Sequence, residues 1–364
     1  MISIAKPLIG ENEIAAVVEV MKSGQLAFGP VVEEFERALA AYSGYKHAVA
    51  TTNGTTALHA AMAVLGVGRG DEVIIPDFTF IATANTPRFV GAKPVFVDVD
   101  PKTFNISPEA VRAAVTPKTK AVLAVSLYGQ AYDVDALRAI AKEKNLKLVS
   151  DNAQAIGAKW KNNRNFGEDC ATLSFYPTKN ATTGEGGALL TDNDETAEKA
   201  RIFRNHGQGA QYDYKGFGYN FRMTSLCAAI GIEQLKRVDG FNDARRRNAK
   251  QYGELLASVA EKGKIELPQE DARCYHVYHQ YTIKCKRGQR DRDALRDFLK
   301  QKQIGSGVYY PAPLHLLPTF GARANTPVTK ALCKEVLSLP VHPALSEEDV
   351  RTVAAAIKEF YKIK

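Results

Sequence analysis

One lysine stands in surroundings that favour covalent amine chemistry. Lys179 lies in "SFYPTKNATTGEGG", on a loop that follows the strand-like segment "ATLSF", with the hydroxyl of Ser174 five residues before it. A lysine that loses water contact beside other positive charge has a lowered pKa and becomes a nucleophile. Glycines at 184, 186 and 187 let another body approach the backbone closely. The alternative is a solvated loop lysine.

A carboxylate ends another apolar strand-like segment. Asp151 closes "LKLVSD", and Gln154 follows three residues later. A buried carboxylate needs a cationic partner, so Asp151 is a candidate for binding a positively charged group. The alternative is a helix cap or a structural salt bridge.

A third feature precedes a helical segment, in "TTNGTTALH". Gly54 and Thr55 stand where free backbone N–H groups and a hydroxyl at a helix N-terminus form an anion site. Ordinary capping by Asn53 or Thr55 is the alternative. Together the three features describe one ligand that has a phosphate, a cationic ring nitrogen and an aldehyde. Pyridoxal phosphate has all three. Phe80 in "PDFTFIATAN" is a candidate to stack on its ring, and filling the core is its alternative.

The elements that must position these residues alternate along the first two thirds of the chain. Apolar strand-like segments are separated by segments with helical periodicity, which predicts an α/β fold with a mostly parallel central sheet flanked by helices. The predicted helices cover residues 55–65, 79–91, 107–115 and 133–145, and the predicted strands cover residues 72–76, 94–100, 120–129 and 146–151. Such sheets bind ligands at the carboxyl ends of their strands. The segment 66–71, "GVGRGD", follows a helix and precedes a strand, so we interpret it as a turn.

The remainder has an α+β pattern and predicts a smaller C-terminal domain. The segment 275–285 alternates like a half-exposed strand, and predicted helices follow at 291–303 and 346–363. We therefore divide the chain into a large cofactor-binding domain, residues 1–238, and a small domain, residues 239–364.

Composition is typical of a soluble globular protein. Of the 364 residues 45% are hydrophobic and 24% charged, and the net charge is +8. No apolar run approaches the about 18 residues of a membrane span, and the start lacks the order of a signal peptide, so we expect a cytoplasmic protein. Five widely spaced cysteines favour free thiols over disulfides or a metal site. We see no nucleic-acid module, and we interpret the cluster Arg245–Arg247 as a solvated helix face.

The ordered set of motifs resembles the DegT-type nucleotide-sugar aminotransferases, which are pyridoxal-phosphate enzymes of the aspartate aminotransferase fold. The set runs from "SGQLAFGPVVEEFE" through "NGTTALHAAM", "PDFTFIATAN", "DNAQAIGA", "SFYPTKNATTGEGG", "RNHG" and "GYNFRMTSLCAAIGIEQL" to "YYPAPLHLLP". The resemblance implies that Lys179 bonds the cofactor, that Asp151 pairs with its ring nitrogen, and that Gln154 lies near the ring hydroxyl. The other implied contacts are Thr55, Thr56 and Ser174 for the phosphate, Asn220 for the phosphate of the partner subunit in a homodimer, and His206, Arg222, Tyr310 and His315 around the substrate.

The resemblance also implies a reaction. An amino donor, L-glutamate, would convert the cofactor to pyridoxamine phosphate, and a nucleotide-linked keto-sugar would then receive the amino group. Lys179 would act as base and acid, and the glycines after it would make room for a phosphate and a sugar. "TTGEGG" favours a 4-keto-6-deoxy sugar. The alternatives are a sugar dehydratase of the same family, whose members carry histidine in place of the lysine, and a non-catalytic regulator that binds a nucleotide-sugar.

Overall fold

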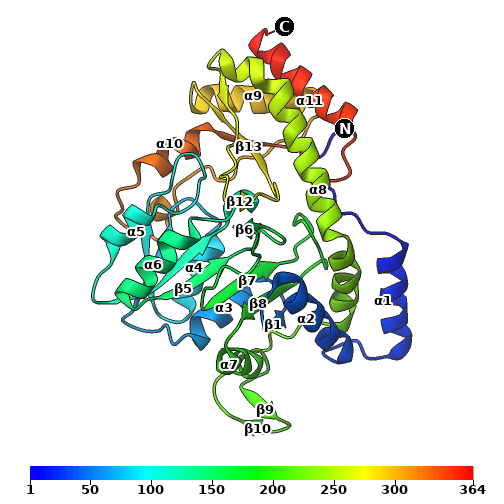
Figure 1. Cartoon of the computed structure of the whole chain (residues 1–364), viewed down its shortest axis with the longest axis vertical. Helices are drawn as coiled ribbons and strands as arrows, with labels where there is room; N and C mark the ends of the chain where they lie inside the picture. Colours follow the sequence, from blue (N-terminus) through cyan, green and yellow to red (C-terminus); the bar gives the residue numbers. More distant parts are fainter. Residues whose placement is uncertain (364) are drawn as a thin grey trace.

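The computed structural model describes residues 1–363 and consists of two sheets with their helices, linked by one long helix, α8 (Figure 1). The larger sheet has seven strands in the order β1-β8-β7-β5-β4-β2-β3, and β8 runs antiparallel to both neighbours while the remaining pairs are parallel. This arrangement confirms the predicted α/β fold with a mostly parallel sheet. Its strands are β1 (His47–Thr51), β2 (Glu72–Pro76), β3 (Lys93–Val97), β4 (Thr119–Val125), β5 (Lys147–Asp151), β7 (Cys170–Ser174) and β8 (Gly187–Thr191).

Helices cover both faces of this sheet because successive strand residues point to opposite sides. In β2, Val73 and Ile75 pack with α3, α4 and α7, whereas Ile74 packs with α5 and α6 on the other face. Near β1 and β7 that second face is covered by α2 and the first half of α8. The helices are α1 (Glu11–Ser23), α2 (Pro30–Ser43), α3 (Gly54–Val64), α4 (Ile81–Phe89), α5 (Pro108–Ala114), α6 (Val134–Lys144), α7 (Asp194–Arg204) and α8 (Ser225–Glu261).

The second sheet is small and antiparallel, in the order β11-β13-β14, and it packs against the C-terminal half of α8 and against α9 and α11. Its elements are β11 (Ile265–Glu266), β13 (Tyr281–Cys285), α9 (Gln289–Gln301), α10 (Pro327–Glu335), β14 (Val336–Leu339) and α11 (Glu347–Tyr361). The predicted domain boundary after residue 238 falls inside α8, which continues through it without a break. Ile2 also bridges Ile304, so the chain start lies against the C-terminal part. The division into two domains stays a prediction.

Short elements complete the fold. They are the pair β6 (Lys159–Trp160) and β12 (Cys274–Tyr275), the hairpin β9 (Gln208–Ala210) and β10 (Asp213–Tyr214), and the 3-10 turns η1 (Leu127–Gly129) and η2 (Leu314–Leu316). Residues 66–71 form the expected turn. Among residues 1–363, no helix has both the length and the apolar character needed to span a membrane.

Two sequence-based interpretations need correction. Segment 275–285 is not one half-exposed strand: β12 ends at Tyr275, β13 starts at Tyr281, and β13 is buried throughout because it is the middle strand of its sheet. The Arg245–Arg247 cluster is solvated only in part, since Arg247 is exposed and Arg246 is half-buried but Arg245 is buried. Arg245 exposes only 4% of its surface, because α8 is covered at this level by the chain that enters β13.

Candidate functional site

Lys179 and Asp151 come together at the carboxyl ends of two neighbouring parallel strands. Asp151 is the last residue of β5 and pairs in register with Thr172 of β7, and the loop after β7 carries Lys179. Burial lowers the pKa of Lys179 to about 8, and the charge of Asp151 opposes part of that shift. The site therefore holds an amine that gives up its proton far more readily than an ordinary lysine, as a nucleophile or base requires.

Asp151 is itself 5% exposed, and burial raises the pKa of its carboxyl group. Three groups oppose this rise: the Thr83 hydroxyl, which donates to Oδ2 at 2.9 Å, the Ala153 amide, which donates to Oδ1 at 3.2 Å, and the charge of Lys179. Thr83 comes from α4, and sequence reasoning missed it because nothing separates it from other threonines in a helix. These donors fix the orientation of the carboxylate, which can accept a further hydrogen bond.

Gln154, Tyr310 and Phe80 form the wall beside this carboxylate. Gln154 accepts a hydrogen bond from the Tyr128 amide at 2.8 Å, and its Nε2 donates to the Tyr310 hydroxyl at 3.2 Å. The rings of Phe80 and Tyr310 lie 6.2 Å apart. Phe80 is 54% exposed, so it does not fill the core and offers a free aromatic face. Burial raises the pKa of Tyr310, with a contribution from Asp151, which places this hydroxyl within the field of the same site.

The start of α3 forms an anion cradle next to β7. A Cβ on Gly54 would lie 2.8 Å from Cβ of Ser174, so the helix start and the strand end are in contact. Within residues 1–363, the amides of Gly54 and Thr55 have no hydrogen-bond acceptor. The predicted capping alternative is also present: Asn53 accepts from the Thr56 amide at 2.9 Å, and the Thr56 hydroxyl donates to the Asn53 carbonyl. Thr56 is thus engaged in the cap.

Two of the glycines after Lys179 lie against other parts of the chain. A Cβ on Gly187 would lie 2.3 Å from the Asn53 carbonyl, and one on Gly186 would lie 2.2 Å from the Thr183 hydroxyl. These two glycines give room to the start of α3 and to the loop itself. The expected room for a phosphate and a sugar stays a prediction. Gly184 has φ +80°, a left-handed conformation that favours glycine, and no atom would lie within 4 Å of its Cβ.

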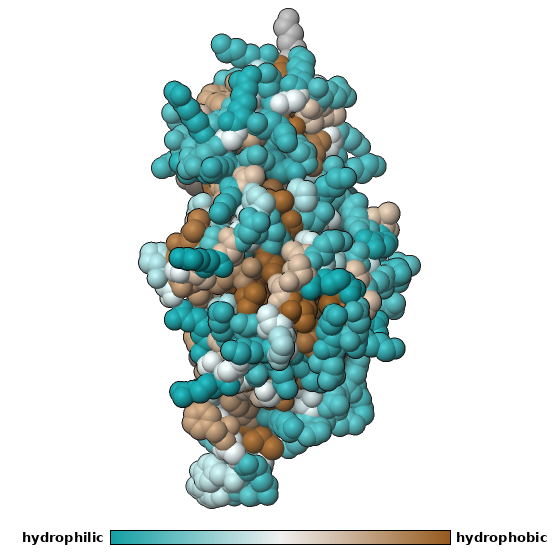
Figure 2. Space-filling model, turned by 90° about the vertical axis from the view of Figure 1, so that its left-hand side faces the viewer, coloured by the Kyte–Doolittle hydropathy of each residue, from teal (hydrophilic) through white to brown (hydrophobic). Residues whose placement is uncertain are grey.

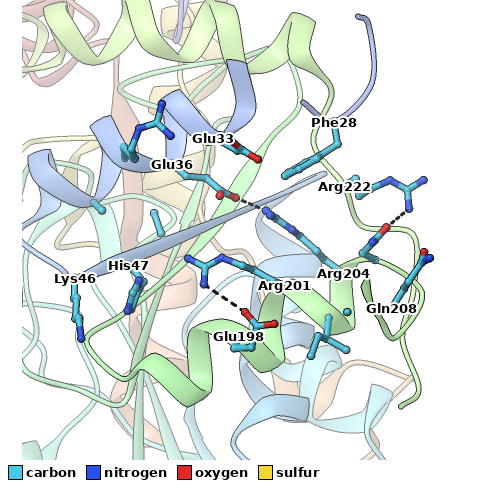
Figure 3. Close-up of a pocket in the computed structure, with 16 residues that line it drawn as sticks. Phe28, Glu33, Glu36, Lys46, His47, Glu198, Arg201, Arg204, Gln208 and Arg222 are labelled. Carbon is cyan, nitrogen blue, oxygen red and sulfur yellow. Dashed lines mark hydrogen bonds and ion pairs between the residues drawn. The ribbon is translucent and has the colours of Figure 1, made fainter. Parts of the chain in front are cut away.

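The remaining predicted site residues lie elsewhere. His206 and Asn220 are exposed beside the β9–β10 hairpin, and Arg222 donates to Asn205 at 2.8 Å in a pocket of about 480 Å³ (Figure 3). Figure 3 also shows the ion pair between Glu36 and Arg204 in its wall. In residues 1–363, no hydrogen bond joins His206, Asn220 or Arg222 to Lys179 or Asp151. Their substrate and phosphate roles stay predictions.

His315 is enclosed by other residues. It is 2% exposed and pairs through Nδ1 with Asp77 at 2.5 Å, while its amide donates to the same carboxylate at 2.8 Å. A role against substrate likewise stays a prediction. In the part of the chain that the structure describes, no cluster of histidine, cysteine or acidic residues could hold a metal ion.

The chain matches the DegT/DnrJ/EryC1/StrS aminotransferase family over residues 7–358, and it belongs to this family. It is 45% identical over 94% of its length to a "Pleiotropic regulatory protein" of Geobacillus stearothermophilus, covering 93% of that protein. It is 39% identical to the GDP-perosamine synthase of Caulobacter vibrioides, with 98% of each chain covered. It is 38% identical to the UDP-2-acetamido-2-deoxy-3-oxo-D-glucuronate aminotransferase of Pseudomonas aeruginosa, with 94% of each chain covered.

A "Putative sugar aminotransferase" from Streptococcus pneumoniae, solved in a PLP form, superposes with a TM-score of 0.93 at 29% identity, covering 99% of this chain and 98% of the other. The same bacterial protein was also solved in a PMP form. The family consists of pyridoxal-phosphate-dependent aminotransferases, and this chain is one of them.

The residues at this sheet edge fit pyridoxal phosphate. The unpartnered amides of Gly54 and Thr55, beside Ser174, suit a phosphate, the oriented carboxylate of Asp151 suits a ring nitrogen, and the amine of Lys179 suits an aldehyde. All three groups lie at one edge of the sheet.

Proposed function

We propose that this enzyme transfers an amino group from an amino acid, L-glutamate, to a keto-sugar carried on a nucleotide. The observation that carries the proposal is the pairing at one sheet edge of Lys179, whose pKa is lowered to about 8, with the buried carboxylate of Asp151. The names of two relatives, a GDP-perosamine synthase and a UDP-sugar aminotransferase, support nucleotide-sugars as the acceptor class.

Each side chain has a role in this proposal. The bound cofactor supplies an aldehyde for imine formation and a ring that accepts electrons. Lys179 would bond that aldehyde at rest, and its Nζ would take and return a proton during turnover. Asp151 would hold a proton at the ring nitrogen, Gln154 would contact the ring hydroxyl, and Phe80 would stack on the ring. Gly54, Thr55 and Ser174 would hold the phosphate through the free amides at the start of α3 and the hydroxyls of Thr55 and Ser174, whereas the predicted Thr56 contact needs its hydroxyl released from the Asn53 carbonyl.

We further propose a 4-keto-6-deoxy sugar as the acceptor. The "TTGEGG" sequence after Lys179 and the likeness to a GDP-perosamine synthase favour it. The 3-oxo sugar named for another relative is the competing substrate. A panel of nucleotide-linked 3-keto and 4-keto sugars, incubated with holoenzyme and L-glutamate and scored by product mass, decides between them. Amination of the 3-keto sugars alone would overturn the 4-keto assignment.

The working unit is a homodimer in this proposal, and Asn220 of each subunit completes the site of the other. The β9–β10 hairpin projects from the body (Figure 1) and carries the exposed aromatic residues Tyr212 and Tyr214, and Phe217, which follows the hairpin, is 76% exposed. Figure 2 shows that hydrophobic residues also gather at mid-height on one side of the molecule, surrounded by hydrophilic ones. Large exposed apolar areas are typical of protein interfaces.

A non-catalytic regulator is a second candidate, because the 45%-identical relative is named a regulatory protein. A pure regulator has no use for a nucleophilic Lys179 beside Asp151. Adding L-glutamate to holoenzyme separates the two. An aminotransferase releases 2-oxoglutarate and loses the visible absorbance of its lysine-bound cofactor, whereas a regulator does neither. The dehydratase alternative is disfavoured by Lys179 itself, because the dehydratases carry histidine there.

A further inference from the structure

The residue after the lysine belongs to a buried polar network. Asn180 is 5% exposed, and its Nδ2 donates to Oδ1 of Asn242 at 2.7 Å and to the Val277 carbonyl at 3.0 Å. Its Oδ1 faces Nδ1 of His279 at 3.2 Å. The network therefore joins the lysine loop to α8 and to the segment between β12 and β13.

The hydrogen bonds fix the proton on His279. A carbonyl oxygen only accepts, so the hydrogen bond to the Val277 carbonyl fixes the orientation of the Asn180 amide group. The Oδ1 of Asn180 therefore accepts a hydrogen bond from an N–H at Nδ1 of His279. Burial holds the pKa of His279 well below its usual value, and the charges of Lys179 and Arg245 lower it further. His279 is thus a neutral imidazole at pH 7, and its Nε2 carries the lone pair.

Arg245 completes the network from α8. Its Nη1 donates to the Tyr278 and His279 carbonyls, both at 3.2 Å, and among residues 1–363 no carboxylate lies within ion-pair distance of it. The Nε of Arg245 has no hydrogen-bond partner among residues 1–363. Burial lowers the pKa of Arg245 to about 9, so the group is still charged at pH 7. Its bonds to the two carbonyls hold the chain between β12 and β13 against α8.

We propose that Asn180, His279 and Arg245 are positioning residues for Lys179: they clamp the lysine loop to α8 and to the approach to β13, and so hold the lysine amine in its buried position. The proposal rests on the proposed function of Lys179. A fixed loop keeps water from the amine, and the lost hydration lowers the pKa of the lysine.

The clamp is tested in cofactor-free protein, where the apparent pKa of Lys179 is measured by competitive acetylation across pH with peptide mass spectrometry. Asn180→Ala and Arg245→Met should each raise that pKa by about one unit or more, toward the ordinary value for lysine. Arg245→Lys keeps a charge and hydrogen-bond donors at this position, so the pKa of Lys179 should stay close to the parent's value. In holoenzyme, Asn180→Ala should lower kcat at least about tenfold while KM for L-glutamate changes little.

Asn248→Ala is the matched control. Asn248 is also a buried asparagine of α8, and its Nδ2 donates to the Val341 and His342 carbonyls, away from the lysine loop. This variant should destabilise the protein without moving the pKa of Lys179. If Asn248→Ala and Asn180→Ala shift that pKa equally, or if neither Asn180→Ala nor Arg245→Met shifts it, the clamp is wrong. The acetylation measurement needs no substrate, so an incorrect sugar assignment would leave its result unchanged.

Discussion

Lys179 becomes chemically useful through what surrounds it. Its side chain is partly buried, and the lost hydration lowers its pKa to about 8, while Asp151 limits the shift. Asp151 in turn would be protonated more readily without the Thr83 hydroxyl and the Ala153 amide. Burial therefore favours the unprotonated amine of Lys179, whereas the charge of Lys179 favours the ionised carboxylate of Asp151.

Burying Lys179 carries a stability penalty in cofactor-free protein, and Lys179→Met should remove it. The pKa is lowered on folding, so the unfolded chain binds the proton more tightly, and the penalty is complete below pH 8. It shrinks as pH rises from about 8 to 10.5. The variant should therefore have a higher Tm than the parent at pH 7, and the gap should narrow toward pH 10.5. The same change at Lys250, whose side chain is 81% exposed, is the control and should show no such trend.

Asp151→Asn should keep the shape of the site and lose its charge. Charged hydrogen bonds contribute about 1.5–3 kcal/mol, so we expect kcat with L-glutamate to fall about 10- to 100-fold or more. Equilibrium dialysis should show that cofactor still binds, because the phosphate cradle at α3 is separate from this side chain. An unchanged kcat would mean that Asp151 does not face the ring nitrogen.

At the scale of elements, the start of α3 and the end of β7 must touch for the cradle to form. The absence of side chains at Gly54 and Gly187 permits this contact. A sequence signals this weakly: "GEGG" predicts close approach to the backbone but does not say what approaches. At Gly187 the close neighbour is the backbone of Asn53 and Gly54.

Gly187→Ala tests that contact. Its Cβ would lie 2.3 Å from the Asn53 carbonyl, so the strand and helix start must separate. We expect a loss of stability of about 1–3 kcal/mol in urea unfolding, together with weaker phosphate-dependent cofactor binding. Gly240→Ala in α8, where no atom lies within 4 Å of the new Cβ, should instead stabilise by about 0.5–1 kcal/mol. Equal effects of the two variants would contradict the account.

The sequence predicted β2, β3, β4, β5 and β7 of the larger sheet because these segments are apolar, and it placed Asp151 at the end of β5 and Lys179 in the loop after β7. It failed at Arg245, where periodicity identifies a helix but cannot say that residues 276–280 cover it. It also failed at Thr83 and His279, which act through neighbours distant in sequence. Such contacts become visible only when separate elements are brought together.

At the scale of the whole molecule, two sheets share one helix, and the lysine loop contacts both that helix and the approach to the small sheet. In the described residues of a single chain, no hydrogen bond joins Asn220 to Lys179. A second copy is the partner that would bring Asn220 to the site, since dimers of identical chains are the commonest assembly.

Mixing two defective variants tests this arrangement. Lys179→Ala and Asn220→Ala should each be nearly inactive alone, but a mixed dimer has one site with both residues intact if Asn220 acts across the interface. With random mixing, activity should recover to about a quarter of the parent's. If Asn220 acts within its own chain, no recovery follows co-expression.

The central claim is that Lys179 bonds the aldehyde of pyridoxal phosphate. Holoenzyme treated with borohydride and digested should yield one peptide, spanning residue 179, that carries the reduced cofactor. Lys179→Ala treated in the same way should carry none. Reduced cofactor on a different lysine, or no label in saturated holoenzyme, would contradict the account.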